Sequence, residues 1–146
     1  MHALEHVAYA SEAVTVLSDG QLRALLERAR SKNTTVGLTG MLLYVDRSFF
    51  QILEGAPEAV ATVYEAIARD PRHRRMVKLI QEPIDRRDFA DWTMGLARVS
   101  SSELASLPGF RDFLTTQRTL DRLGEGRARE LLSAFREGRW RARVGA

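Results

Sequence analysis

The sequence lacks several residue types and patterns, and each absence excludes a class of protein. No cysteine occurs among its 146 residues, so disulfides and thiolate-bound metals are excluded. No apolar stretch approaches the length of about 18 residues that a membrane-spanning helix needs. The start of the chain also lacks the basic and apolar segments of an export signal. We therefore expect a cytoplasmic protein that does not associate with membranes.

The common catalytic motifs are missing as well. The chain has no Gly-rich phosphate loop, no G-x-S-x-G turn and no H-E-x-x-H pair. Its three histidines, His2, His6 and His73, do not have the spacing of metal ligands. The sequence therefore predicts no metal site and does not indicate an enzyme.

The composition that remains is that of one globular domain with a core of its own: 45% of the residues are hydrophobic and 28% are charged. The net charge of +3 arises in residues 101–146, which contain nine arginines and six acidic residues. Arg139, Arg141 and Arg143 surround Trp140 there, a pattern that can contact nucleic acid. Three arginines are too few for a groove-sized footprint, so we favour a solvated terminus and expect no nucleic-acid partner.

Hydrophobic periodicity predicts an alternation of strands and helices in residues 1–100. The predicted strands span residues 4–10, 39–45, 48–53, 76–80 and 92–99, and the helices span 18–33 and 57–70. Ser18 and Gln21 have the spacing of a capping box at the start of the first helix. The resulting order, β-α-β-β-α-β-β, is the α+β ferredoxin-like pattern with an added strand and both helices on one face.

Residues 101–146 carry apolar side chains at helical spacing, interrupted by Pro108, Gly124 and Gly126. They predict two or three helices whose apolar faces pack against the free face of the sheet or against a second copy of the chain. We therefore expect two regions, a globular domain at 1–100 and a helical extension at 101–146.

Two polar side chains fall at positions where burial is expected. The period of two in the third strand puts Gln51 on one face with Phe49 and Leu53, and Tyr9 lies in the first strand. A buried amide and a buried phenol both need partners. Either the two bond to each other in the core, or both point at a ligand between the helices, together with Asn33. Asn33 alone would be only a helix C-cap.

A cationic segment follows the second helix, at residues 70–75. It is either a solvated loop or a phosphate clamp in which Arg72 and His73 hold a nucleotide. Trp92 and Met94, two apart on the fifth predicted strand, share a face and by default belong to the core.

Several motifs now coincide in order along the chain. They are Tyr9-x-Ser11, Asn33 followed by Gly37–Tyr44, Phe50–Gly55, Asp70–His73 and Phe89–Met94. Because of these motifs, the sequence from residue 4 to about 101 resembles the BLUF family of blue-light photoreceptors. The resemblance implies a ferredoxin-like fold that holds a flavin ring between its two helices.

The resemblance also implies a role for each matching residue. Tyr9 would be the photoactive electron and proton donor, Gln51 the amide that joins it to the flavin, and Asn33 the contact to the polar edge of the ring. Leu26, Leu38, Phe49 and Ile67 would pack on the ring, and Asp70, Arg72 and His73 would lie near the ribityl and phosphate end. Trp92 and Met94 would pass the signal out of the pocket. The cofactor would be FAD, with FMN or riboflavin tolerated. Lys32 is a departure, because many members have Asn or His there.

The expected function is therefore blue-light sensing without substrate turnover. The residues after 101 are too few for a fused effector domain, so the resemblance implies an effector protein in trans and a homodimer or larger homo-oligomer. Two alternatives remain. One is an acylphosphatase-like hydrolase, disfavoured because residues 10–14 are acidic and lack glycine. The other is a ligand-free ferredoxin-like dimerisation module.

Overall fold

The computed structural model describes residues 3–15, 17–45, 47–90, 94–98, 101–104 and 124–137. The elements are β1 (Leu4–Ala13), α1 (Asp19–Val36), β2 (Thr39–Val45), β3 (Ser48–Gly55), α2 (Pro57–Ala68), β4 (His73–Ile84), β5 (Gly95–Arg98), α3 (Ser101–Leu104) and α5 (Gly124–Arg136). From β1 to β5 they follow the predicted β-α-β-β-α-β-β order.

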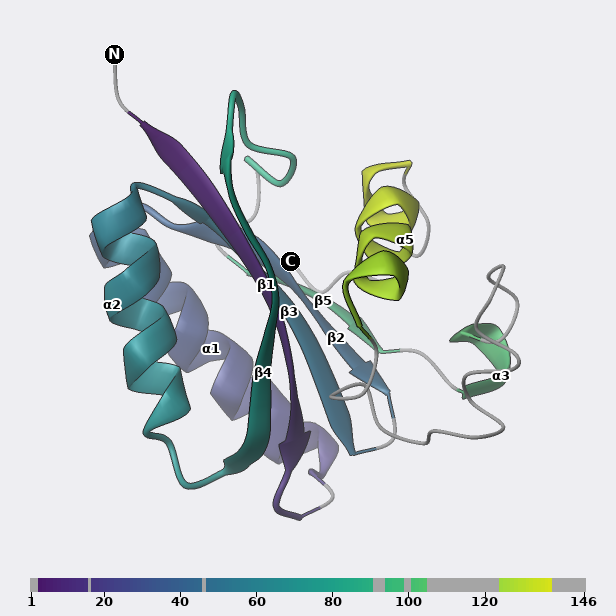
Figure 1. Ribbon diagram of the computed structural model, residues 1–146. Helices are drawn as coiled ribbons and strands as arrows, with labels where there is room; N and C mark the ends of the chain where they lie inside the picture. The colour runs from purple at the N-terminus through teal and green to yellow at the C-terminus, as the bar shows by residue number, and fades with distance from the viewer. Residues whose placement is uncertain are drawn as a thin grey trace.

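The strands form one sheet in the order β4-β1-β3-β2-β5 (Figure 1). Neighbouring strands are antiparallel except β2 and β5, which are parallel. The first four strands have the ferredoxin-like arrangement, and β5 is the added strand at the edge. The predicted α+β fold class is confirmed.

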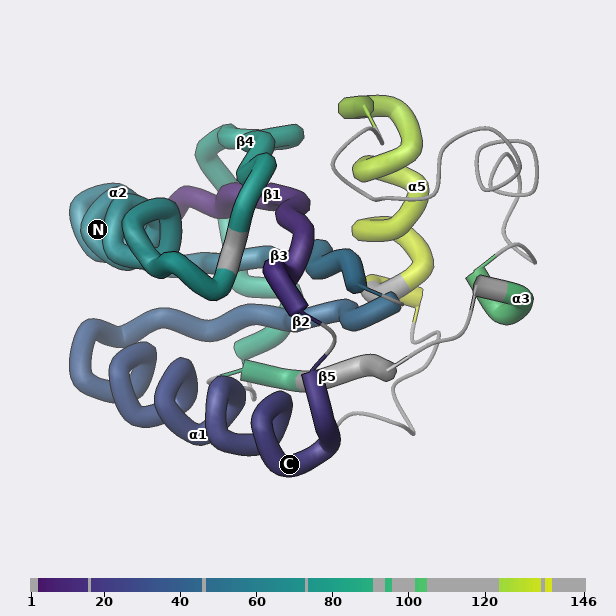
Figure 2. Tube along the Cα trace, turned by 90° about the horizontal axis from the view of Figure 1, so that it is seen from below, coloured from purple at the N-terminus to yellow at the C-terminus, as the bar shows by residue number. Residues whose placement is uncertain are grey.

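Each face of the sheet is covered by different helices, as Figures 1 and 2 both show. Helices α1 and α2 cover one face, where Val7, Tyr9 and Phe49 belong to a shared core. Helix α5 lies on the other face, where Leu131 shares a core with Phe50 and the other strand residues whose side chains point away from α1 and α2. Because side chains alternate along a strand, β1, β2 and β3 each supply both cores. The predicted packing of C-terminal helices on the free face is thus confirmed for α5.

The ends of several elements differ from the predictions. The capping box of α1 is present, because Gln21 N donates to Ser18 Oγ at 3.1 Å and Ser18 N donates to Gln21 Oε1 at 2.9 Å. However, α1 continues past Asn33 to Val36 and ends at Gly37, whose φ of 75° is left-handed. Glycine adopts this conformation without a steric penalty, so Gly37 sets the end of the helix.

The first and fourth strands are longer than predicted. β1 extends to Ala13, and β4 runs from His73 to Ile84, including Pro83. β4 is an edge strand, where the missing N–H of a proline is tolerated. β5 begins only at Gly95. Pairing with a neighbouring strand decided these limits, and the apolar pattern of each segment alone did not reveal them.

Some sequence predictions concern residues that the structure does not describe. Trp92, Trp140 and the three neighbouring arginines Arg139, Arg141 and Arg143 lie outside the described residues. The division of the chain at residue 100 stays a prediction. Among the described helices, none is long and apolar enough to cross a membrane.

Candidate functional site

A cavity of about 150 Å³ lies on the face of the sheet that α1 and α2 cover. It is lined from α1 by Leu25, Arg28, Ala29, Lys32 and Asn33, from α2 and the turn after it by Val63, Ala66, Ile67, Asp70 and Arg72, and from the strands by Leu42, Phe49 and Gln51. Apolar walls with a few convergent polar groups are typical of sites for small molecules.

The cavity brings together many of the predicted binding residues. Those that line it are Asn33, Phe49, Gln51, Ile67, Asp70 and Arg72. Tyr9, Leu26 and Leu38 do not line it, although all three are buried in the core beneath the same two helices. The backbone of His73 begins β4, and its side chain lies outside the described part of the chain.

Tyr9 and Gln51 are direct partners in the pairing of β1 with β3. The Tyr9 side chain is fully buried, yet its hydroxyl has no hydrogen-bond partner among the described residues. Gln51 instead donates from Nε2 to the Met94 sulfur at 3.5 Å. The interpretation of a core hydrogen bond between Tyr9 and Gln51 is therefore wrong. A buried phenol without a partner is costly, which points to a partner outside the chain.

Burial also controls the protonation of Tyr9. Loss of hydration raises the pKa of the Tyr9 hydroxyl well above its ordinary value of 10.0, and the neighbouring Tyr64 contributes in the same direction. The two rings meet edge to face, with centroids 5.4 Å apart. Tyr9 is thus a neutral phenol at physiological pH.

Asn33 lies in the last turn of α1 and is 1% exposed. Its carbonyl oxygen accepts the backbone N–H groups of Gly37 and Leu38, the latter at 2.9 Å. The alternative in which Asn33 is the helix C-cap is wrong, because Gly37 has that position. Asn33 also lines the cavity, where an amide can bond a polar ligand edge.

Cationic side chains gather where α1 faces the turn after α2. Arg72 Nε donates to both carboxylate oxygens of Asp70, at 2.9 and 3.1 Å, and this bond raises the pKa of Arg72. Arg28 and Lys32 line the cavity four residues apart on α1. Sequence reasoning missed Arg28 as a candidate, although its helical spacing with Leu25 and Lys32 indicates a common face.

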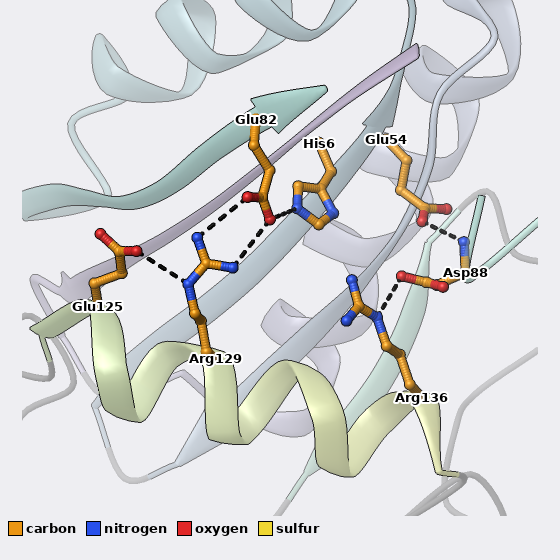
Figure 3. A network of polar contacts seen from close by, with 7 residues as sticks. All are labelled: His6, Glu54, Glu82, Asp88, Glu125, Arg129 and Arg136. Carbon is orange, nitrogen blue, oxygen red and sulfur yellow. Dashed lines mark hydrogen bonds and ion pairs between the residues drawn. The ribbon is translucent and has the colours of Figure 1, made fainter. Parts of the chain in front are cut away.

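A network of charged residues holds α5 at the opposite face of the sheet (Figure 3). Arg129 of α5 binds both carboxylate oxygens of Glu82 at 3.1 Å, and Glu82 also bonds His6 at 2.9 Å. Hydrogen bonds, from Arg129 first and His6 second, lower the pKa of Glu82 from 4.5 to about 2. Sequence reasoning did not find this network, because its members are far apart in the chain.

A second group of contacts lies at the other end of α5. Arg136 donates to Asp88 Oδ2 at 2.7 Å, and Asp88 N donates to Glu54 Oε2 at 2.7 Å. Glu54 is fully buried and also accepts from Thr39 Oγ1 and Phe89 N. This carboxylate ties the loop between β4 and β5 to the sheet, and the loop in turn contacts α5 (Figure 3).

Fold and site together define a class of protein: a ferredoxin-like domain with a fifth strand, a ligand cavity between its two helices, and a buried phenol and amide on adjacent strands beneath them. Residues 4–95 match the family model described as sensors of blue-light using FAD. The chain belongs to this BLUF family.

Relatives with described functions agree with this assignment. The chain is 35% identical over 113 residues to the photoactivated adenylate cyclase subunit beta of Euglena longa, in a match that covers 77% of this chain and 13% of the relative. It is 36% identical over 76 residues to the blue light- and temperature-regulated antirepressor BluF of Escherichia coli, covering 52% and 19%. The chain therefore spans only a small part of each of these relatives.

Solved structures match over more of their length. The dark-state structure of BlrB, a BLUF protein, is 31% identical, has a TM-score of 0.71, and is covered to 98% by 94% of this chain. The ground state of BlsA is 28% identical with a TM-score of 0.75, covered to 87% by 91% of this chain. A bacterial light-regulated adenylyl cyclase matches with a TM-score of 0.66 at 28% identity, covering 79% of this chain and 34% of its own.

These findings establish a BLUF blue-light sensor domain that uses a flavin. The cavity suits such a cofactor, because Phe49 and Ile67 offer apolar surface, and Gln51 and Asn33 offer amides. BLUF domains are sensor modules, and the match to the photoactivated adenylate cyclase subunit covers only 13% of that relative. Neither the hydrolase nor the dimerisation module is favoured by the comparisons.

Proposed function

We propose that Tyr9 and Gln51 carry the light response of this domain. The observation that supports the proposal most strongly is the fully buried Tyr9 hydroxyl, which lacks a hydrogen-bond partner among the described residues and pairs in register with Gln51. Gln51 lines the cavity, and Tyr9 lies directly beside Gln51 on the adjacent strand. Gln51 can therefore connect the phenol to a bound ring.

The bound flavin supplies absorption of blue light and, when excited, a strong electron acceptor. Tyr9 is suited to donate to this acceptor, because a neutral phenol can release an electron and then its proton. The raised pKa of Tyr9 keeps the proton in place before illumination. A phenylalanine at this position would provide neither.

Gln51 is suited to change its hydrogen bonds after Tyr9 has released its electron and proton. Its amide has a donor at one end and an acceptor at the other, so a turn of the side chain or a change of tautomer reverses the direction of the hydrogen bonds through it. In the structure the amide nitrogen donates to Met94. After light we expect this bond to be exchanged for one to the flavin.

The remaining residues hold the cofactor. Asn33 binds the polar edge of the ring, and Asp70, Arg72 and His73 lie toward its ribityl and phosphate end. The residues that pack around the ring are Leu26, Leu38, Phe49 and Ile67. FAD is the proposed cofactor, and FMN and riboflavin are tolerated.

The signal leaves through Met94, which directly precedes β5. The Met94 carbonyl accepts from Arg30 Nε at 2.9 Å, so this residue contacts α1 as well as Gln51. A displaced Met94 would shift the edge strand and, across the sheet, the support of α5. Trp92 remains the proposed second member of this output pair.

We propose that the output is a contact with an effector protein in trans, made by the helical extension at 101–146. The sensor domain at 1–100 is proposed to work in the cytoplasm as a homodimer or larger homo-oligomer. Helix α5 supports this reading, because partly exposed charged pairs hold it to β4 and to the loop between β4 and β5.

Absorption spectra in the dark and after blue light test the proposal. The parent protein should show a flavin spectrum that shifts to the red and recovers, and Tyr9→Phe should bind flavin without the shift. Tyr44→Phe is the matched control, since Tyr44 belongs to the same core and its hydroxyl contacts Leu17 N at 3.1 Å. This variant should keep the shift. A protein that stays colourless after reconstitution with FAD, or a Tyr9→Phe variant that shifts like the parent, would refute the proposal.

A further inference from the structure

The Tyr9 ring contacts a second phenol, which the proposed light response does not use. Tyr64 of α2 meets Tyr9 edge to face, with ring centroids 5.4 Å apart, and belongs to the same core. Tyr9 is fully buried and Tyr64 is partly exposed, so the pair extends from the core toward solvent. Two phenols in contact can exchange an electron, because the same chemical group is oxidised in each.

A cation lies over the ring of Tyr64. Lys78 Nζ is 4.7 Å from the Tyr64 ring centroid, and Lys78 of β4 pairs in register with Tyr9 of β1. The same ammonium donates a hydrogen bond to Gln81 Oε1 at 2.9 Å, which restrains its position. An ammonium is attracted by the face of a neutral ring and repelled by a ring that has lost an electron. Lys78 therefore makes Tyr64 harder to oxidise.

This arrangement determines which ring stays oxidised after light. When Tyr9 has given one electron to the excited flavin, its ring is left as a radical cation. Tyr64 can refill that ring with one electron of its own, after which Tyr9 is neutral again and the hydroxyl proton of the oxidised Tyr64 passes to water. Tyr9 then keeps its proton, and the hydrogen bonds through Gln51 stay as they were. Electron donation by Tyr64 therefore wastes the absorbed light.

We propose that Tyr64 competes with the productive reaction by returning an electron to Tyr9, and that the Lys78 ammonium over its ring suppresses this competition. Lys78 is a positioning residue in this role, because it acts on Tyr9 through Tyr64 and keeps the oxidised site beside Gln51. The inference rests on the proposed role of Tyr9 and adds two residues that decide how efficiently absorbed light is used.

The quantum yield of the red-shifted state, measured per absorbed photon on the flavin-loaded full chain, tests this role. Lys78→Gln should lower the yield at least about twofold, the factor expected from loss of an exposed cation–π contact. Adding Tyr64→Phe to Lys78→Gln should restore the yield, because phenylalanine cannot supply the electron. A loss caused only by altered packing would not be restored in this way.

Three further variants serve as controls for the quantum yield, and all should match the parent. Tyr64→Phe alone removes a donor that Lys78 already suppresses. Lys78→Arg keeps a positive charge over the ring. Arg69→Gln removes a positive charge from the exposed C-cap of α2, the helix that carries Tyr64, and leaves Lys78 in place.

A second measurement does not need the flavin. The flavin-free chain is illuminated with a ruthenium tris-bipyridyl photo-oxidant and persulfate, and oxidation of Tyr64 is measured by mass spectrometry relative to that of Tyr44. Lys78→Gln should raise the oxidation of Tyr64 at least about twofold over the parent.

Three results would each overturn the inference: a parental quantum yield in Lys78→Gln, parental oxidation of Tyr64 in that variant, or a yield that stays low when Tyr64→Phe is added. A Tyr9→Phe variant that shifts like the parent, or a parent that binds no flavin, would instead refute the proposed function. The two kinds of failure are therefore distinguishable.

Discussion

The two faces of the sheet treat buried polar groups in opposite ways. Beneath α1 and α2, Tyr9 is fully buried without a hydrogen-bond partner among the described residues, and Gln51 has only a long contact to sulfur. Beneath α5, Glu54 is equally buried but accepts three hydrogen bonds, and Glu82 is held by Arg129 and His6. One face is incomplete without a ligand, whereas the other is largely completed by the chain itself.

This difference indicates that one face binds a ligand, whereas the other face holds α5 in place. Unpaired polar groups in a cavity carry a free-energy cost that a ligand with matching groups recovers on binding. Paired groups around α5 stabilise one position of that helix and its loop. An exception on that face is His6 Nδ1, which is buried and has no hydrogen-bond partner among the described residues.

The largest loss of stability on substitution is expected at Glu54, on the α5 face. In Glu54→Gln an NH₂ group replaces one acceptor oxygen and faces either a backbone N–H or Thr39 Oγ1. We expect the free energy of unfolding to fall by about 2–3 kcal/mol, measured by urea denaturation. Glu5→Gln, on the neighbouring strand and partly exposed, is the control and should change it by less than about 0.5 kcal/mol. Equal losses of unfolding free energy in both variants would contradict the conclusion that the chain itself pairs the buried polar groups of the α5 face.

A smaller effect of opposite sign is expected at Tyr9. Tyr9→Phe removes an unpaired hydroxyl, so the flavin-free protein should gain about 1 kcal/mol in free energy of unfolding. Tyr44→Phe removes a hydroxyl that accepts the Leu17 N–H, so it should lose about 1 kcal/mol. Denaturation of both variants without flavin measures the difference. A loss at Tyr9 as large as that at Tyr44 would show that its hydroxyl is paired after all.

The smallest effect is expected at Glu82 and depends on pH. Its pKa is lowered from 4.5 to about 2 in the folded protein, so its contribution to stability is complete above the ordinary pKa and is lost as the pH falls toward 2. Thermal unfolding of Glu82→Gln between about pH 6 and 2 should therefore show a shallower decline than that of the parent. Glu125→Gln, which removes only the exposed i,i+4 partner of Arg129, should keep the parental slope. A parental slope in Glu82→Gln would place the acid sensitivity elsewhere.

Local patterns predicted much of this molecule. Ser18 and Gln21 marked the start of α1, because a capping box involves only neighbouring residues. The period of two placed Phe49, Gln51 and Leu53 on one face of β3, and Phe49 and Gln51 line the cavity together. The end of α1 was misjudged at Asn33, because a buried asparagine in the last turn resembles a cap unless its surroundings are known.

The sequence by itself determined the order of elements, the two-sided sheet and, through its motifs, the family and its flavin. Only the tertiary structure decided that the Tyr9 hydroxyl stays unpaired among the described residues, that Arg28 and Arg72 line the same cavity, and that Glu82 binds Arg129. The physical reason is the range of the interactions. Periodicity and capping depend on residues within a turn or two, whereas a cavity or a charged pair forms between segments that only folding brings together, such as residues 82 and 129.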